Sequence, residues 1–249
     1  MTTVKNIFDY LNLLFPVDTA LSFDNVGLLV GDENSEITKC LIALDCTHSV
    51  VKKATDEGCE LIITHHPVIF TPLKSLTSGD LQFELVKNGI SVISMHTNLD
   101  MAYGGVNDCL CKALELKNVS AVTAEDGFIL KSGELSPLSA DNLAVYIKNK
   151  LNCRVTYVDG RKPIKKVLVC SGSGGEFVTD AINGKFDALI TSEIKHHQYL
   201  TAHACGISVF DAGHFNTENV VVEPLKNILS DKFTDIMFLT DRTTCIKQV

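Results

Sequence analysis

Apolar segments recur along the chain at a fixed spacing, and this recurrence constrains the fold more than any other feature of the sequence. Two pairs of segments lie 127 residues apart, Lys39–Leu44 with Lys166–Ser171 and Cys59–Thr64 with Phe186–Thr191. A third match comes later in each half, where the tetrapeptide Gly-Ile-Ser-Val begins at Gly89 and again at Gly206. Three matches in the same order indicate an internal duplication rather than a chance likeness between short apolar strands.

Both halves show the same alternation of strand and helix patterns. Strands are expected at 40–44, 60–64 and 91–95 with helices at 49–57 and 79–87, then strands at 167–170, 188–191 and 208–210 with helices at 177–183 and 194–204. Such alternation is typical of βαβ units with right-handed crossovers and parallel central strands. We therefore predict an α/β fold of two similar βαβ-type domains, residues 1–125 and 126–249. A return of the final segment to the first domain is left open.

The composition is that of an ordinary globular protein, and it excludes several classes of function. Of 249 residues, 45% are hydrophobic and 21% charged, and the net charge of −8 disfavours nucleic acid as the main partner. No segment approaches the ~18 apolar residues of a membrane span, and the N-terminus lacks a signal-peptide pattern. The nine cysteines include no Cys-x-x-Cys pair, which fits a reducing compartment. We expect a cytoplasmic protein without a membrane partner.

Adjacent histidines, His65 and His66, end the apolar run Glu60–Thr64 immediately before Pro67. Pro67 cannot continue a strand ladder, so both imidazoles lie where a strand gives way to a loop, the place where open α/β sheets keep their ligand sites. Because successive strand residues point to opposite faces, the two rings reach one centre only if the backbone turns. Alternatively, each ring serves one of two neighbouring metals.

Two further pairs of histidine and carboxylate follow strand ends. His96 with Asp100 comes after the first Gly-Ile-Ser-Val, and His214 with Glu218 comes after the second. On a helix this spacing brings imidazole and carboxylate to one face, about 6 Å apart at Cβ. Mixed ligation of this kind suits Zn²⁺, Mn²⁺, Fe²⁺ or Co²⁺. The four histidines and two carboxylates exceed what one catalytic metal needs, so we predict a dinuclear site in the cleft between the two domains.

Each motif also has a purely structural interpretation. The adjacent histidines alone fit a hydrogen-bonded loop, and His214 with Glu218 alone fits an ion pair at a helix start. Asp24 and Asn25 fit either an Asx turn or a place in the site. The glycine-rich segment 171–175 lacks the Lys-Ser/Thr of a phosphate-binding loop, so it favours a tight strand-to-helix turn over an anion cradle.

The second half has different residues where the first has its histidine pair. Ser192 and Glu193 occupy the corresponding repeat positions, directly after an apolar strand. His196 and His197 fall on the helix that follows, so at most one of them faces the site. Ser192 and Glu193 are therefore both placed to enter the predicted site.

These motifs together resemble the Nif-three-like family, many members of which are named as homologues of GTP cyclohydrolase I type 2. The resemblance runs nearly end to end and rests on Phe23–Leu28, Thr64–Pro67, His96 with Asp100, Ser192–His197, and Gly213-His214 with Glu218. It implies two similar α/β domains that enclose a dinuclear metal centre, and subunits that assemble into a toroidal homohexamer.

The resemblance also implies a role for individual residues. His65 and Asp100 would bind one ion and His66 and His214 the other, with Glu218 bridging both. His96 would line the site and hydrogen-bond a metal-bound water. Glu193 is the candidate proton shuttle.

From these observations we expect a dinuclear-metal-dependent hydrolase whose metal-bridging water attacks a small, nucleotide-like substrate. Opening of the purine ring of GTP, which requires attack at C8, is one such reaction. The alternative is a non-catalytic metal-binding or regulatory scaffold that forms a ring. The choice among zinc, manganese, iron and cobalt is open in both cases.

Overall fold

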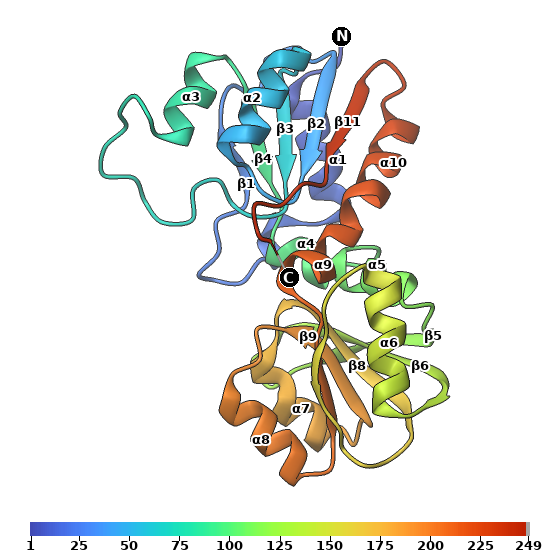
Figure 1. Ribbon diagram of the computed structural model, residues 1–249. Coiled ribbons are helices and arrows are strands. Elements are labelled where there is room, and N and C mark those ends of the chain that lie inside the picture. The colour runs from blue at the N-terminus through green and yellow to red at the C-terminus, as the bar shows by residue number, and fades with distance from the viewer. Residues whose placement is uncertain (248–249) are drawn as a thin grey trace. The chain divides into compact units, whose positions relative to one another are not determined.

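The computed structural model describes residues 1–247 and shows two compact units (Figure 1). Unit 1 comprises Met1–Ala102 and Val222–Thr243, and unit 2 comprises Tyr103–Val221 and, of the described residues after Thr243, 244–247. This division differs from the expected boundary at residue 125. That boundary would cut the hairpin of β5 (Lys117–Thr123) and β6 (Ile129–Leu138), whose strands pair antiparallel within unit 2. The later segment Val222–Thr243 returns to unit 1.

Unit 1 is built on a five-stranded sheet of order β1-β4-β3-β2-β11. Its strands are β1 (Gly27–Val30), β2 (Lys39–Ala43), β3 (Leu61–Thr64), β4 (Ser91–Ser94) and β11 (Met237–Asp241). Its helices are α1 (Val4–Leu14), the 3₁₀ turn η1 (Val17–Thr19), α2 (His48–Glu57), α3 (Leu81–Lys87), α4 (Thr97–Met101) and α10 (Val222–Lys232). All strands run parallel except β1, which pairs antiparallel with β4 at one edge.

Buried apolar runs explain the strands of unit 1. Every residue of β3 and β4 is buried, as expected for parallel strands covered on both faces. On one face α2 and α3 pack against the sheet, where Val51, Ala54 and Leu85 join Leu41 and Ile62 in a single apolar cluster. Helix α2 begins at a Thr47 cap and ends at a left-handed Gly58, so the chain can turn directly into β3.

Unit 2 is built on a six-stranded sheet of order β5-β6-β8-β9-β10-β7. Besides β5 and β6, its strands are β7 (Thr156–Val158), β8 (Ile164–Ser173), β9 (Ala188–Ser192) and β10 (Ser208–Asp211). Its helices are α5 (Val106–Ala113), α6 (Ala140–Leu151), η2 (Gly175–Phe177), α7 (Val178–Asn183), α8 (His196–Ala204), α9 (His214–Glu218) and η3 (Asn219–Val221). Strands β8, β9 and β10 are parallel, whereas β6 and β7 join them antiparallel.

The two units share a topology. Each has three adjacent parallel strands linked by two helices, β2-α2-β3-α3-β4 in unit 1 and β8-α7-β9-α8-β10 in unit 2 (Figure 1). In each, an antiparallel edge strand pairs with the third parallel strand, and a short helix follows that strand. The alternation predicted from sequence is confirmed for these ten elements. Among the residues that the structure describes, no helix has the length and apolarity to cross a membrane.

Candidate metal centre

The chain turns sharply where β3 ends, and the turn brings two adjacent imidazoles side by side. The backbone N–H groups of His65 and His66 both donate to the carbonyl of Leu44, at 3.2 and 3.0 Å. The Thr64 hydroxyl donates to the His66 carbonyl at 2.9 Å and lies 2.8 Å from the hydroxyl of Ser94. The two ring centroids are 4.9 Å apart. This turn allows two successive residues at a strand end to present both rings in one place.

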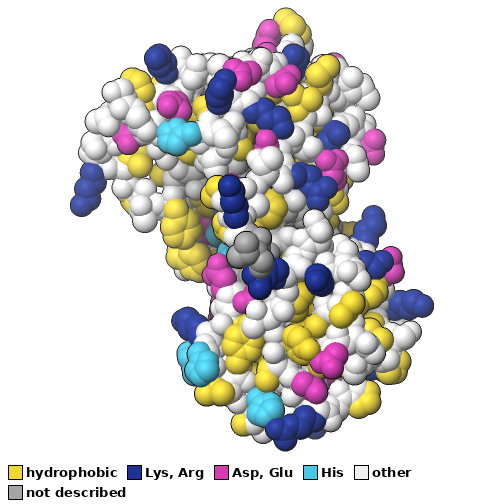
Figure 2. All heavy atoms as spheres, viewed as in Figure 1, with side chains coloured by type: hydrophobic (Ala, Val, Ile, Leu, Met, Phe, Trp, Pro, Cys, Tyr) yellow, Lys and Arg dark blue, Asp and Glu magenta, His cyan; other side chains and the backbone are white. Residues whose placement is uncertain are grey.

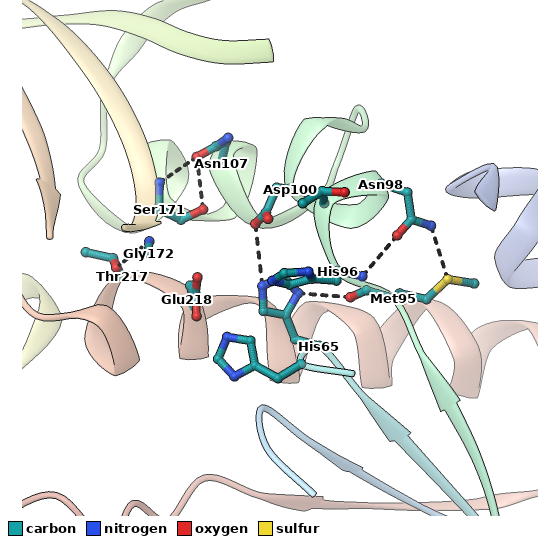
Figure 3. Close-up of polar contacts among 12 residues, drawn as sticks. His65, Met95, His96, Asn98, Asp100, Asn107, Ser171, Gly172, Thr217 and Glu218 are labelled. Atoms are coloured by element: carbon teal, nitrogen blue, oxygen red, sulfur yellow. Dashed lines mark hydrogen bonds and ion pairs between the residues drawn. The ribbon is translucent and has the colours of Figure 1, made fainter. Parts of the chain in front are cut away.

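His96 completes a cluster of three imidazoles in unit 1. It lies at the N-terminus of α4, where its backbone N–H donates to Asn98 Oδ1 at 3.0 Å (Figure 3). Its ring centroid lies 5.2 Å from that of His65 and 5.7 Å from that of His66. Ligand nitrogens of the three rings lie within 4.8 Å of one another. Asp100, on α4, adds a carboxylate oxygen 3.6 Å from His65 Nε2.

Each imidazole of this cluster is held at Nδ1 by an oxygen atom. The Nδ1 distances are 2.9 Å to the Met95 carbonyl for His65, 2.7 Å to Asp45 Oδ1 for His66, and 2.9 Å to Asp24 Oδ1 for His96. An oxygen acceptor assigns the proton of the neutral ring to Nδ1, so the lone pair is at Nε2. Metal-binding histidines are held in this way, with the second nitrogen donating to a carboxylate or carbonyl.

Asp24 holds both His96 and the first residue of α4. Its buried carboxylate accepts hydrogen bonds from His96 Nδ1, from the Thr97 N–H at 3.0 Å and from the Thr97 hydroxyl at 2.6 Å. Burial alone would raise the pKa of Asp24, but the bonds from His96 and Thr97 outweigh it and lower the pKa to about 2. Asn25 serves elsewhere, because its side chain donates to the Ile69 carbonyl at 2.6 Å.

Unit 2 carries a smaller group of the same residue types. His214 and Glu218 lie at the two ends of α9, and His214 Nε2 is 3.0 Å from Glu218 Oε2. Glu193, just past the end of β9, places Oε1 2.8 Å from His214 Nδ1. The hydrogen bond that His214 donates to the Glu218 carboxylate raises the pKa of His214 to about 9 against the opposing effect of burial, and Glu193 adds to the rise.

Glu193 adopts a backbone conformation that few non-glycine residues take. Its φ is +54°, in the left-handed region where a side chain is strained by about 1–2 kcal/mol. The conformation follows β9 directly and brings the carboxylate to the imidazole of His214. Here Glu193 acts as an orienting partner of a predicted ligand. Its role as a proton shuttle stays a prediction.

The glycine-rich segment after β8 packs against α9. A Cβ at Gly172, whose φ is +61°, would collide with Oε1 of Glu218. The Gly172 N–H donates to the Thr217 hydroxyl at 3.0 Å, and the Ser171 N–H donates to Asn107 Oδ1 at 2.7 Å (Figure 3). These N–H groups are used within the protein, which favours the tight turn over the anion cradle.

The structure adds residues that the sequence motifs do not reveal. Asp45 lies two residues beyond β2 and anchors His66, although no motif includes it. Its position at a strand exit is the one signal in the sequence that indicates it. His196 and His197 are exposed on α8, and no hydrogen bond of the described residues ties either ring to His214 or Glu218.

The donor chemistry of both units fits first-row divalent cations. Unit 1 offers three Nε2 atoms and the Asp100 carboxylate, while unit 2 offers one Nε2 atom and the Glu218 carboxylate. Nitrogen and oxygen donors of this kind suit zinc, manganese, iron or cobalt. The anchored Nδ1 atoms support this fit in unit 1, because each neutral ring there presents a single lone pair in a fixed direction. His214 can do the same once it loses the proton on Nε2, which lies 3.0 Å from Glu218.

Known proteins resemble this chain in sequence and in structure over most of its length. A protein named GTP cyclohydrolase 1 type 2 homolog from Clostridium perfringens is 34% identical, with 96% of each chain covered. One of the same name from Lactococcus lactis is 34% identical over 80% of this chain and 81% of its own.

Solved structures also match this chain over nearly its whole length. The crystal structure of Staphylococcus aureus protein SA1388 matches with a TM-score of 0.92 and 30% identity, covering 99% of both chains. Reduced HcgD from Methanocaldococcus jannaschii matches with a TM-score of 0.84 and 29% identity, covering 96% of this chain and 97% of its own. The family model of Duf34/NIF3 (NGG1p interacting factor 3) matches residues 2–245. This chain therefore belongs to the Duf34/NIF3 family.

Proposed function

We propose that this protein is a metal-dependent hydrolase that holds two divalent ions and acts on a small, nucleotide-like substrate. One observation carries the proposal. Four imidazoles, those of His65, His66, His96 and His214, are each held at Nδ1 by an oxygen, so that Nε2 is the nitrogen left for the site, as a ligand atom in His65, His66 and His214 and as a proton acceptor in His96. The name of the curated relatives, GTP cyclohydrolase 1 type 2 homolog, supports a nucleotide-like substrate.

The proposal assigns ligands from both units to one dinuclear centre. His65 and Asp100 would hold one ion, His66 and His214 the other, and Glu218 would bridge the two. The common topology of the units supports an origin by internal duplication. The family resemblance supports assembly into a ring-shaped homohexamer.

Bound divalent ions supply Lewis acidity and lower the pKa of water, so that hydrolysis can proceed at neutral pH. The remaining steps belong to the protein's own side chains. Because His96 donates from Nδ1 to Asp24, its Nε2 can accept a proton from a water that attacks the substrate. The buried Asp24 carboxylate holds the ring in place for this transfer. Glu193 orients His214, and its side chain is 56% exposed, so it can also exchange a proton with solvent.

The test combines metal analysis with a hydrolysis screen. Protein purified without chelators should contain divalent metal, and with Mn²⁺, Zn²⁺ or Fe²⁺ it should hydrolyse a nucleotide or phosphoester. Glu218→Ala should abolish turnover. Glu218→Gln, which preserves side-chain size, should do the same if folding is intact by circular dichroism. Glu57→Ala, at an exposed glutamate that ends α2, is the control.

Two results would contradict the hydrolase assignment. Turnover retained by Glu218→Ala would remove Glu218 from the mechanism. Stoichiometric bound metal with no turnover across a broad panel of nucleotides and phosphoesters would favour the alternative, a metal-binding or regulatory scaffold.

A further inference from the structure

Two exposed phenylalanines border the histidine cluster of unit 1. Phe23, between η1 and β1, is 63% exposed, and Phe70, in the loop between β3 and α3, is 50% exposed. Their ring centroids are 6.4 Å apart at an interplanar angle of 57°. Phe70 also meets the ring of His96 edge-on, with centroids 6.3 Å apart and an angle of 86°. An aromatic surface open to solvent therefore adjoins one of the candidate site imidazoles.

The backbones that carry the two rings are tied to the rest of unit 1. Asn25, two residues after Phe23, donates to the carbonyl of Ile69, the residue before Phe70. Gln82 donates to the Val68 carbonyl at 2.6 Å, which fastens the same loop to α3. Figure 1 shows this long loop leaving β3 before the chain enters α3. The two rings are thus presented from anchored positions, and a ligand that meets them need not order the loop first.

The carboxylate of Asp24, the residue after Phe23, does not add a charge to the aromatic surface. Asp24 follows Phe23 directly, but its oxygens are taken by His96 and Thr97, and its side chain is buried. The two phenylalanine rings therefore offer π faces and edges without an adjacent free carboxylate. A surface of this kind recognises a flat ring by stacking rather than by reading its polar edge. In Figure 2 hydrophobic side chains are visible on the surface of the molecule among charged ones.

We propose that Phe23 and Phe70 form a stacking platform that binds the planar aromatic ring of the substrate beside His96. This inference rests on the proposed function and names the residues that would bind the planar, heteroaromatic base of its nucleotide-like substrate. Stacking of a base on an aromatic side chain contributes about 1–3 kcal/mol in nucleic-acid complexes. The ring would be held at the candidate site by contacts that are independent of the metal ligands.

The test compares two ligands that differ only in the ring. Guanosine monophosphate and ribose 5-phosphate are titrated calorimetrically into the full chain, once metal-loaded and once metal-free. The parent protein should bind guanosine monophosphate more tightly than ribose 5-phosphate. Phe23→Ala and Phe70→Ala should each lower the affinity for guanosine monophosphate about tenfold, which lies in the lower part of the range for one lost stacking contact. Affinity for ribose 5-phosphate should not change.

Three further variants separate stacking from general apolarity. Phe70→Tyr keeps the ring and should retain the parent affinity, whereas Phe70→Leu keeps apolar bulk and should weaken binding as much as Phe70→Ala does. Leu73→Ala removes another exposed apolar side chain of the same loop, 48% exposed, and should leave the affinity unchanged. Metal content of each variant is measured in parallel and should equal that of the parent.

Several outcomes would overturn the stacking platform. Equal affinity of the parent for both ligands would show that the ring is not recognised. Parent-like binding by Phe70→Leu would replace stacking with simple apolar contact. Unchanged guanosine monophosphate affinity in Phe70→Ala, with an altered sedimentation coefficient, would assign the two rings to a contact between subunits. Failure of the proposed function has a separate signature, the absence of bound metal in the parent, and it leaves the ring effect measurable in the metal-free titration.

Discussion

The same topological position carries different chemistry in the two units. Where β3 ends, unit 1 has His65 and His66, and where β9 ends, unit 2 has Ser192 and Glu193. The next parallel strand is followed in both units by histidine and, four residues later, a carboxylate. Ser192 is buried and donates to the Gly172 carbonyl, while Glu193 holds His214. One unit thus supplies candidate ligands at its second strand, and the other supplies groups that hold a ligand in place.

The units also differ in how the third-strand imidazole is anchored. In unit 1 His96 is held by Asp24, whose side chain is buried. In unit 2 His214 is held by Glu193, whose side chain is 56% exposed. A buried anchor acts through a medium of low dielectric and is protected from salt, whereas an exposed anchor is screened. The comparison therefore predicts unequal effects for equivalent substitutions.

The largest expected effect on metal affinity comes from giving the end of β3 the same residues as the end of β9. His65→Ser combined with His66→Glu gives β3 the pair that follows β9 and removes two proposed ligands. We expect metal affinity to fall by more than the roughly 10–100-fold that loss of an outer contact causes. Metal analysis after gel filtration measures this, with circular dichroism to confirm folding. Parent-like metal content would show that the β3 exit does not bind metal.

The next effect concerns the loop beneath Glu218. Gly172→Ala introduces a Cβ that collides with the Glu218 carboxylate, so metal affinity should fall at least tenfold, as for a lost outer contact. Gly89→Ala is a matched control, because its φ is +66° and a Cβ there meets nothing within 4 Å. Both variants should lose about 1–2 kcal/mol of stability from left-handed strain, but Gly89→Ala should bind metal normally. Equal metal loss in both would point to general destabilisation.

The two anchoring carboxylates should differ in their contribution to stability. Asp24→Asn removes a buried charge that accepts four hydrogen bonds and should cost about 2 kcal/mol in the metal-free protein. Glu193→Gln, at an exposed ion pair, should cost less than about 1 kcal/mol. Urea denaturation measures both. The reverse order would contradict the contrast between buried and exposed anchors.

Asp24 also predicts how stability depends on pH. Its folded pKa of about 2 lies below the ordinary value of 3.8, so the unfolded state takes up the proton first as the pH falls. The stabilisation is fully present above pH 4 and is lost as the pH falls toward 2. Asp24→Asn should lose this part of the acid sensitivity. Superimposable acid-denaturation curves for variant and parent would refute the assignment.

The smallest effect is a proton released by metal binding. With a pKa of about 9, His214 is protonated at neutral pH in the metal-free protein, and it must lose a proton to act as a ligand. Metal affinity at this residue should rise as pH increases from 7 to 9. Calorimetry in buffers of different ionisation enthalpy should detect about one proton released per chain at pH 7 from this group. The His214→Ala variant should lack that proton.

The parallel cores of both units could be predicted from sequence, and the edges could not. Runs such as Leu61–Thr64 are buried on both faces and bounded by turn residues, so their pattern is unambiguous. Strand β5 is almost wholly exposed along its seven residues, and β7 has only three. Neither leaves a hydrophobic pattern, which also explains why the boundary at residue 125 fell inside a hairpin.

The candidate site was predictable where it follows strand ends in short motifs. His65, His66 and His214 stand out in this way, as do the carboxylates four residues after a histidine. The anchors are harder to find, since Asp45 and His66 are 21 residues apart and Asp24 and His96 are 72 apart. A pairing over that distance depends on tertiary structure. A single sequence does not contain it.

The path of the chain between the units bears on how the protein is made. Strand β11 completes the sheet of unit 1 beside β2, yet the whole of Tyr103–Val221 precedes it in the sequence. On the ribosome, domains fold as their residues emerge, so unit 1 must wait with an open edge at β2 while unit 2 is synthesised. A translational pause or a cleavage before Met237 would leave that edge available for pairing with other chains.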